Sequence, residues 1–352
     1  MTTAPTRLAI GPANYAGQAH AWAKAVERHL DVPADSFNRG PLRRHDFRFE
    51  TDREIPAPLF FAPLLRRARL KGFLRRYSHV ALDGFTTFFQ TPARRDVAAD
   101  ALFLRENGFQ VALVAHGSDL RDPAEHIRRN RWSYFNEGDE AYRAHHAELA
   151  RRAQEAVRRT GLPCFVSTPD LLHDLPQATW LPVCIDPASA VVGDEPLRRR
   201  VPRVLHMPSR RVPPIKGSQY VEPVLQRLEQ EGLVEFVSPS RVPHAEVPAL
   251  LAGVDIVVDQ LLAASYGVTA VEAMAAGRVT VAAVSEATVE LMPQRPPLVD
   301  ADPDTFEQVM RDVLERRDEA RELAAQGPGF VAAWHDGGAS ARRLQPWLRP
   351  AG

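Results

Sequence analysis

The sequence predicts two α/β domains, each a Rossmann-like parallel sheet with helices packed on its faces. The chain has 352 residues, a length that favours two domains of ordinary size over one. Short β-branched apolar runs, typical of strands buried on both faces, alternate with amphipathic helical segments in both halves. Several of these runs lead directly into polar or glycine-rich segments. In parallel sheets that carboxyl edge is where ligands bind.

Composition excludes several functional classes. Apolar residues make up 45% and charged residues 25% of the chain, values typical of a soluble globular protein. The 44 basic and 44 acidic residues cancel, so no general attraction to nucleic acid is expected. The N-terminus lacks the pattern of a signal peptide, and no window approaches the roughly 20 apolar residues of a membrane span. Two cysteines, Cys164 and Cys184, lack metal or redox spacing, and we expect reduced thiols in a cytoplasmic protein.

The first predicted strand, Arg7 to Ile10, leads into a loop bracketed by Gly11 and Gly17, and an amphipathic helix containing Trp22 follows. Glycines at a strand-to-helix turn let a ligand or another backbone approach closely. An ordinary tight turn explains the same pattern. Both interpretations stay open for this loop, which also contains Asn14.

Residues 59–77 contain six basic side chains and no acidic one. Such a segment suits a membrane-surface helix or a site for an anionic acceptor. A solvated helix on the flank of a domain is the alternative, and Gly72 weakens a long continuous helix. As a secondary expectation, residues 59–77 contact the inner face of a membrane peripherally.

A clean apolar strand from Phe109 to Ala115 delivers His116, Ser118 and Asp119 to the carboxyl edge of the first sheet. A lone histidine is more often structural than catalytic, but His116 directly follows a buried strand and precedes a glycine. Asp119 fits either a ligand contact or a cap on the turn.

We place the first domain at residues 1–186, a proline-rich basic linker at 187–201, the second domain at 202–329 and a final helix at 330–352. The second domain opens with a strand, Arg203 to His206, followed by a loop with Arg210 and Lys216. Two fixed cations at the carboxyl edge of a sheet would attract an anionic ligand. A basic surface turn is the competing interpretation.

Residues 254–284 read as strand, loop, helix and strand, with Gly267 opening the helix and Gly277 ending it. Backbone N–H groups and the helix dipole at such a helix start favour a phosphate. Glu272 is the only charge on this helix. It fits a capping box with Thr269, or a carboxylate that accepts hydrogen bonds from a ribose.

The segment Tyr-Gly-x-x-x-Val-Glu-Ala-Met-Ala-x-Gly, residues 266–277, resembles the donor-site signature of retaining glycosyltransferases of the GT-B fold, family 4 or group 1. His206-Met-Pro-Ser-Arg210 with Lys216-Gly217 is similar to the basic donor-phosphate segment of that family, and residues 111–119 fit a third element. One departure is Ala264, where the family usually has a second glutamate. This puts the sugar contacts in doubt more than the fold.

The resemblance implies two domains facing each other across a cleft, with a C-terminal helix that crosses back to the first. It implies metal-independent sugar transfer, with retention, from a UDP- or GDP-sugar to a hydroxyl acceptor, without a cofactor. Asp302-Pro303-Asp304 reads as a helix start rather than a metal motif. The alternatives are an inactive nucleotide-sugar-binding protein and a sugar-nucleotide epimerase. The resemblance assigns roles to twelve residues. They are His116, Arg210 and Lys216 as catalytic; Gly17, Pro239, Tyr266, Gly267, Val268 and Glu272 as donor-binding; and Asn14, Ser118 and Asp119 as candidate acceptor or sugar contacts.

Overall fold

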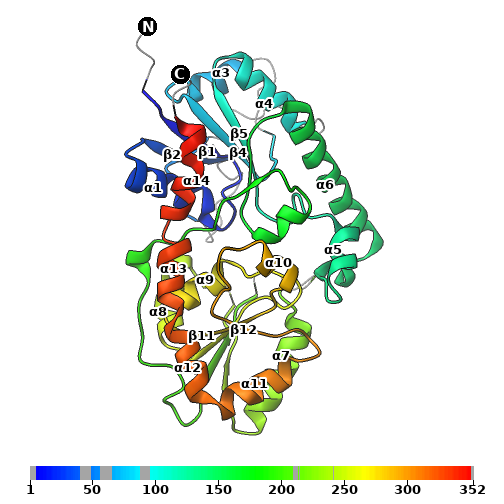
Figure 1. Ribbon diagram of the computed structural model, residues 1–352, viewed down its shortest axis with the longest axis vertical. Coiled ribbons are helices and arrows are strands. Elements are labelled where there is room, and N and C mark those ends of the chain that lie inside the picture. The colour runs from blue at the N-terminus through cyan, green and yellow to red at the C-terminus, as the bar shows by residue number, and fades with distance from the viewer. Residues whose placement is uncertain are drawn as a thin grey trace. The chain divides into compact units, whose positions relative to one another are not determined.

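A computed structural model describes residues 5–39, 49–55, 66–87, 96–208, 213, 215–240 and 242–349. The chain divides into two compact units (Figure 1). Unit 1 comprises Met1–Asp122, His146–Cys184 and Gly337–Gly352, and unit 2 comprises Pro123–His145 and Ile185–Asp336. The predicted boundaries differ from these in three respects. Residues 123–145 belong to the second unit, the second unit resumes at Ile185 and includes the predicted linker 187–201, and the return to the first unit comes at Gly337 rather than at 330.

Unit 1 is built on a seven-stranded sheet whose pairings are all parallel, in the order β3-β2-β1-β4-β5-β6-β7. Leu8, Ile10, Ala81 and Val114 project from its central strands into one core, where they meet the helices α1 and α14. The strands are β1 (Leu8–Gly11), β2 (Ala34–Arg39), β3 (Arg53–Ile55), β4 (His79–Asp83), β5 (Gln110–Ala115), β6 (Cys164–Val166) and β7 (Thr179–Trp180).

The C-terminal helix belongs to unit 1, as predicted. Leu344 and Leu348 of α14 (Gly338–Leu348) pack in the same core as Trp22 of α1 (Gln18–Leu30). Both cysteines lie in this unit and are buried, and Cys184 contacts Ser340 of α14 at 3.4 Å. The other helices of this unit are α3 (Arg66–Leu74), α4 (Val97–Glu106) and α6 (Glu140–Thr160), which starts within the Pro123–His145 segment of unit 2.

Unit 2 contains a five-stranded sheet, again parallel in every pairing, in the order β12-β11-β10-β8-β9. Its strands are β8 (Arg203–His206), β9 (Glu235–Val237), β10 (Ile256–Val258), β11 (Val279–Ala282) and β12 (Val299–Asp300). Its helices are α5 (Pro123–Arg129), α7 (Ser218–Gln230), α8 (Val247–Ala252), α9 (Val268–Ala275), α10 (Glu286–Glu290), α11 (Phe306–Glu315), α12 (Arg317–Ala325) and α13 (Gly327–Trp334).

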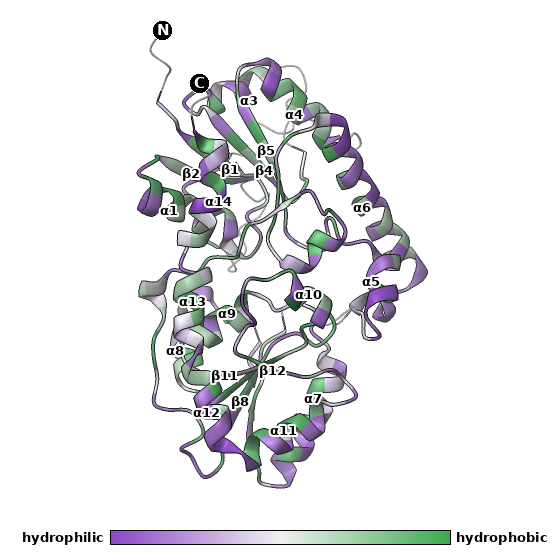
Figure 2. Ribbon diagram, in the orientation of Figure 1, coloured by the Kyte–Doolittle hydropathy of each residue, from purple (hydrophilic) through white to green (hydrophobic). Residues whose placement is uncertain are grey.

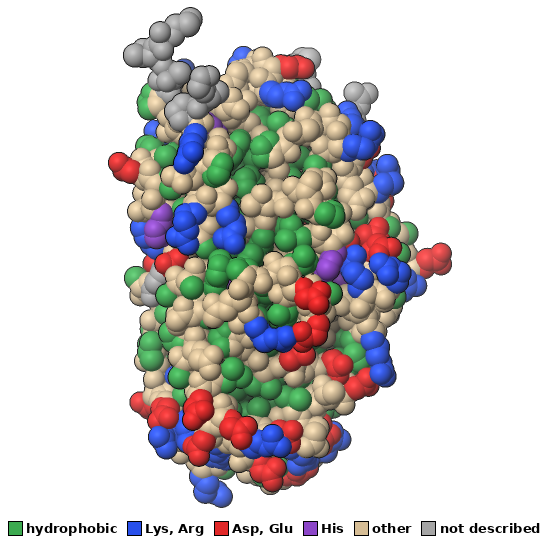
Figure 3. All heavy atoms as spheres, in the orientation of Figure 1, with side chains coloured by type: hydrophobic (Ala, Val, Ile, Leu, Met, Phe, Trp, Pro, Cys, Tyr) green, Lys and Arg blue, Asp and Glu red, His purple; other side chains and the backbone are tan. Residues whose placement is uncertain are grey.

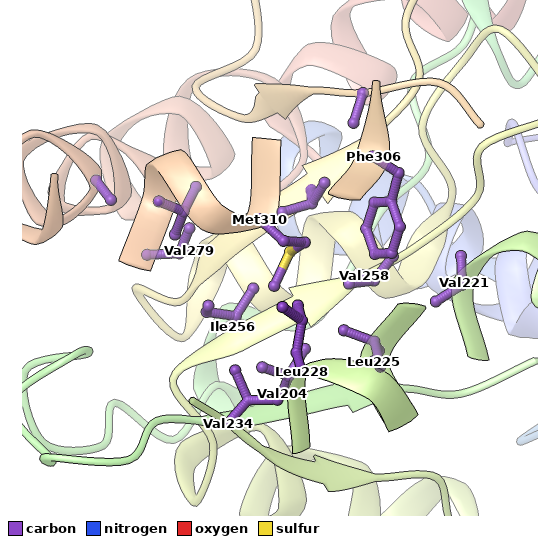
Figure 4. Packing of buried hydrophobic residues seen from close by; sticks show 14 of the residues in the cluster. Val204, Val221, Leu225, Leu228, Val234, Ile256, Val258, Val279, Phe306 and Met310 are labelled. Atoms are coloured by element: carbon purple, nitrogen blue, oxygen red, sulfur yellow. The ribbon is translucent and has the colours of Figure 1, made fainter. Parts of the chain in front are cut away.

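Both faces of this sheet are covered, which explains why its strands read as unbroken apolar runs. Ile256 and Val258 of β10 point to one side, where Phe306 and Met310 of α11 reach toward them (Figure 4). Val257, between them in sequence, points to the other side and packs with α8 and α9. Figure 2 shows the central strands of both sheets mostly in green and the helix α6 mostly in purple.

The segment Pro123–His145 leaves unit 1 after β5 and packs within unit 2. Tyr134 and Phe135 are fully buried against Leu262 and Ala263, and the Tyr134 N–H donates to the Leu262 carbonyl at 3.0 Å. The Tyr220 hydroxyl of α7 donates to Glu137 at 2.9 Å. The chain therefore passes between the units four times, after Asp122, His145, Cys184 and Asp336.

The basic segment 59–77 is described only from Arg66 onward, where α3 runs to Leu74, with Leu70 and Leu74 buried and Arg75 and Arg76 exposed. Residues 59–65 lie outside the described residues. Within the described part of the chain, no helix has the length and apolarity to cross a membrane. Acidic and basic side chains are interspersed over the face in Figure 3, in keeping with a net charge of zero.

Candidate functional site

In unit 1, the candidate site is anchored by Asp83, the last residue of β4. Its carboxylate is fully buried and accepts the N–H groups of Ala13 at 2.7 Å and Asn14 at 2.8 Å. The same carboxylate lies 3.1 Å from Nε2 of His116. A carboxylate can only accept, so Nε2 bears the proton. Asp83 thus fixes both the loop after β1 and the imidazole after β5.

His116 is held on two further sides by aromatic rings. It stacks on Trp22 with centroids 5.4 Å apart, and the Tyr15 ring meets it edge-on at 5.2 Å. Its side chain is 8% exposed. The imidazole is therefore a rigid group at the carboxyl edge of the sheet, as the sequence predicted, and its orientation is set by a carboxylate that sequence reasoning missed.

The predicted site residues Asn14 and Gly17 lie in the loop that Asp83 anchors, and their polar groups form hydrogen bonds within the protein. The Asn14 side chain donates to the Glu50 carbonyl at 2.8 Å and accepts from the His20 N–H at 3.2 Å. Gly17 has a φ of 73° and ends the loop by donating to the Asn14 carbonyl. In this state the Asn14 side chain braces the loop.

Asp119 caps the turn that carries His116. Its carboxylate accepts the N–H groups of His116 at 3.0 Å and Gly117 at 2.6 Å. The carbonyl of Ser118 accepts from His146 at 2.9 Å. The structure thus brings Ser118 and Asp119 together with His116, with Asp119 in the turn-capping role.

In unit 2, Lys216 lies at the carboxyl ends of the neighbouring strands β8 and β10. Its ammonium is 2.8 Å from the fully buried carboxylate of Asp259 and donates to the Met207 carbonyl at 3.2 Å and to the Thr269 hydroxyl at 3.1 Å. The second oxygen of Asp259 accepts the N–H of Gly267 at 2.8 Å. One carboxylate therefore joins the lysine to the start of α9.

His206 contacts the turn that follows Lys216 from the interior of unit 2. It is fully buried, and burial together with the nearby Lys216 charge lowers the pKa of His206 to about 4, so the ring is neutral at pH 7. Nδ1 lies 3.0 Å from the Val258 carbonyl and must donate, which leaves Nε2 to accept from Ser218 at 2.9 Å. Ser218 begins α7 directly after Gly217, whose φ is 81°. His206 thus fixes the turn after Lys216.

Glu272 lies on α9 but is not part of a capping box. The helix begins at Val268, its N-cap is Gly267, and no side chain caps it. The Glu272 carboxylate is instead 3.1 Å from Nε2 of His244, with 17% of the glutamate and 53% of the histidine side chain exposed. The capping-box interpretation is therefore wrong. The N-cap is Gly267, two residues before Thr269, so Thr269 already lies inside the helix and cannot cap it.

The remaining predicted donor residues fall into three groups. Gly267 and Val268 form the start of α9, and Pro239 follows the end of β9 with intermediate exposure. The side chain of Tyr266 is 2% exposed and faces the interior, where its hydroxyl is 3.0 Å from His335. Burial raises the pKa of this phenol, so Tyr266 stays neutral and supports the loop. Arg210 lies outside the described residues.

Ala264, at the position of the missing glutamate, has a left-handed backbone with a φ of 54°. The neighbouring Ser265 hydroxyl is fully buried, and the Ser265 carbonyl accepts from Gln260. The loop between β10 and α9 is thus folded back on itself. Asp83 and Asp259, the two carboxylates that organise the sites, were missed by sequence reasoning. The available signal was the same for both: an aspartate at the carboxyl end of a buried apolar run.

No family model and no curated protein sequence matches this chain. Solved structures do match it over nearly its whole length. Sucrose-phosphate synthase from Thermosynechococcus elongatus is 14% identical, covering 97% of this chain and 98% of that chain, with a TM-score of 0.65. Anabaena Alr3699/HepE, solved with UDP and glucose, is 14% identical, covering 99% and 100%, with a TM-score of 0.59. The catalytic domain of Arabidopsis thaliana starch synthase IV, bound to ADP and acarbose, is 11% identical, covering 98% and 99%, with a TM-score of 0.60.

These likenesses extend over both units and confirm the predicted fold class. The chain has the GT-B fold, with two parallel α/β units and a C-terminal helix that belongs to the first. At 11–14% identity the likeness concerns the fold.

Proposed function

We propose that this GT-B-fold protein is a family 4-like glycosyltransferase, which moves a sugar from a nucleotide sugar to an acceptor hydroxyl with retention of configuration. The observation that carries the proposal is the position of Lys216. Its ammonium lies beside the start of α9 at the carboxyl ends of β8 and β10. A cation next to a helix start, where the helix dipole also attracts negative charge, suits a diphosphate.

The chemistry asked of this site is stabilisation of a leaving diphosphate. The bond between the anomeric carbon and the phosphate oxygen breaks, and the acceptor oxygen bonds to that carbon from the same face. The acceptor proton passes to a phosphate oxygen. Asp259 and Thr269 hold the ammonium in place beforehand, so little reorganisation is needed as charge develops. A fixed cation here performs the task of a divalent metal ion elsewhere, and we propose Arg210 as the second one.

The proposed contacts to the ribose and to the transferred sugar come from residues at the carboxyl edges of the two sheets. Glu272, one turn into α9, is proposed to accept hydrogen bonds from the ribose of a UDP- or GDP-sugar, which requires its carboxylate to exchange His244 for the ribose. His116 is proposed to contact the transferred sugar. Its protonated Nε2 is already engaged by Asp83, so Nδ1 is the group that can interact with a ligand.

The first experiment measures turnover of the donor. The protein is incubated with UDP-, GDP-, ADP- and dTDP-sugars, and slow hydrolysis of one donor is the expected result. Lys216→Gln keeps a donor for Asp259 but removes the charge, and turnover should fall about 10²–10³-fold. Lys71→Gln, at an exposed lysine of unit 1 bonded to Asn107, is the control and should retain full turnover. Unchanged turnover in Lys216→Gln would exclude this lysine from the reaction.

Amine labelling places the ligand directly. The chain has three lysines, at positions 24, 71 and 216, so mass spectrometry distinguishes them. A nucleoside diphosphate should protect Lys216 from labelling and leave Lys24 and Lys71 unprotected. Equal labelling of Lys216 with and without saturating nucleotide would contradict the assignment.

The second candidate function is that of an inactive nucleotide-sugar-binding protein. It is favoured by Ala264, which supplies a methyl group where the related enzymes usually have a carboxylate. Protection of Lys216 without hydrolysis or transfer of any donor would support this alternative.

A further inference from the structure

Two aromatic side chains are exposed beside the loop Gly11–Gly17 of unit 1. Tyr15 is 52% exposed and Phe49 is 39% exposed, and both stand out among the described residues as large apolar side chains left in solvent. The Phe49 ring lies against Gly17, where an added Cβ would come within 3.1 Å of it. Both rings belong to the part of the surface that surrounds this loop, so we asked what ligand they could contact.

The backbone that carries Tyr15 is strained and well fixed. Its neighbours Asn14 and Ala16 both have left-handed conformations, with φ of 47° and 50°, which residues with a Cβ rarely adopt. Such strain persists when the surroundings determine it, and Asp83 supplies two hydrogen bonds to this loop. The loop therefore holds Tyr15 in one place. Because the ring is half exposed, its burial contributes little to the stability of the fold.

The ring itself is also positioned. A Cβ added to Gly84 would lie 2.8 Å from Cε2 of Tyr15, so the ring approaches the backbone of Gly84 closely. One ring edge meets His116 at a centroid distance of 5.2 Å, with the planes 75° apart. Tyr15 thus presents apolar surface within reach of anything that contacts the imidazole.

The surrounding charges narrow the class of ligand. The Glu50 carboxylate is 87% exposed and lies 3.4 Å from His20, and Lys24 of α1 pairs with Asp52 and Glu27 at 2.8 Å. An exposed carboxylate disfavours a phosphate but accepts hydrogen bonds from hydroxyl groups. A ligand with an apolar C–H face and hydroxyls around its edge matches a ring beside such groups. Pyranose sugars have this combination.

We propose that Tyr15 is the stacking platform of an acceptor site, and that the acceptor is a glycan or glycoside whose pyranose ring lies on Tyr15 with a hydroxyl beside His116. The use of this ligand as an acceptor rests on the proposed function. The binding itself does not, because all the groups named lie in unit 1.

The test is saturation-transfer NMR on the full chain without nucleotide. The probes are methyl α- and β-glycosides of glucose, galactose, mannose and N-acetylglucosamine, with glycerol 3-phosphate as an anionic probe. At least one glycoside should bind the parent protein, with the strongest transfer to its ring C–H protons. Tyr15→Phe should retain this binding. Tyr15→Leu keeps apolar bulk against His116 but lacks an aromatic face, and its affinity should be about three- to tenfold lower.

Leu233→Ala, at an exposed apolar residue of unit 2, is the control and should bind like the parent. Equal affinity of Tyr15→Leu and Tyr15→Phe would overturn the proposal, as would binding of glycerol 3-phosphate alone or of no probe at all. Glycoside binding that depends on Tyr15 in a protein without donor turnover would refute the proposed function and leave this site standing. Donor turnover combined with an acceptor KM that is the same in Tyr15→Leu as in the parent would refute this acceptor site and leave the proposed function standing.

Discussion

Two buried aspartates organise the two candidate sites in the same way. Asp83 and Asp259 both lie at the carboxyl end of a central strand and are fully shielded from solvent. Each accepts backbone N–H groups from the loop that faces it and also contacts one candidate catalytic side chain, His116 or Lys216. A buried carboxylate is costly unless it is satisfied, so each anchors its partners strongly.

The substitution Asp83→Asn tests this role at the level of a single residue. The amide offers one acceptor oxygen where the carboxylate offers two, so one loop N–H loses its partner. The free energy of unfolding should fall by about 1–3 kcal/mol. Hydrogen exchange should speed up in residues 11–18, and transfer should slow because His116 loses its orientation.

Asp35→Asn is the matched control for that variant. Asp35 lies on β2 of the same sheet, and its carboxylate bonds Arg7 and Tyr77 rather than the loop or His116. It should lose stability while its transfer rate per folded molecule stays near that of the parent. Unchanged exchange in residues 11–18 or unchanged turnover in Asp83→Asn would show that the loop and imidazole are held by other contacts.

At the scale of secondary-structure elements, α9 owes its start to tertiary contacts. Its N-terminal N–H, that of Gly267, is bonded by Asp259 from a neighbouring strand end. Glu272 therefore has no share in starting the helix, and its carboxylate lies 3.1 Å from Nε2 of the half-exposed His244. Removing the Glu272 charge should consequently affect ligand binding far more than folding.

We expect Glu272→Gln to melt within a few degrees of the parent but to bind the nucleoside diphosphate about ten- to hundredfold more weakly. A neutral amide accepts hydroxyl hydrogen bonds less strongly than a carboxylate, and such bonds to a charged group contribute about 1.5–3 kcal/mol. Calorimetry with inorganic pyrophosphate, which has no ribose, should show unchanged affinity. Glu286→Gln, at another glutamate of unit 2 that pairs with an arginine, is the control. Equal affinity of parent and variant for the nucleotide would remove Glu272 from the site.

The strands buried on both faces were predictable because their sequences are continuous apolar runs. Arg203 to His206 coincides with β8, and Phe109 to Ala115 begins one residue before β5. The strand β2, Ala-Asp-Ser-Phe-Asn-Arg, was missed. Its polar residues satisfy partners from elsewhere in the chain: Asp35 binds Arg7 and Tyr77, and Ser36 binds Asp52. No local pattern reveals such pairs.

The positions of candidate-site residues in the fold were predictable where one segment carries them, and not where several segments meet. Lys216, Gly267 and Glu272 could be placed because each lies within a short motif. The role of Asp259 depends on a lysine 43 residues away in sequence and a helix start eight residues away, which only the folded chain brings together. The same holds for Tyr15, whose ring position depends on the nearby Gly84 and His116.

At the scale of the whole molecule, the units are not consecutive stretches of chain. The segment Pro123–His145 buries Tyr134 and Phe135 in unit 2, and α14 completes the core of unit 1 from the far end of the sequence. Sequence reasoning assumed one crossing at the linker and one at the end. The additional pair of crossings was missed because the packing of residues 123–145 on Leu262 and Ala263 has no local signature.

A cut between residues 186 and 187 should therefore not yield two folded halves. The fragment 1–186 would expose Tyr134 and Phe135 and lack α14, and the fragment 187–352 would lose the cover of Leu262 and Ala263. Each should bind a hydrophobic dye and lack a cooperative thermal transition by circular dichroism, while the intact chain melts cooperatively. A cooperative melt from either fragment alone would contradict the interleaved arrangement.

The two cysteines give the intact chain a practical property. Cys164 and Cys184 are both buried, and burial raises the pKa of the Cys164 thiol, so neither should react with thiol-directed dyes at neutral pH. A cysteine introduced at exposed Arg75 of unit 1 and another at exposed Val192 of unit 2 would then be the reactive thiols. Resonance energy transfer between fluorophores on these two positions would then report changes in the distance between the units as nucleotide and acceptor are added.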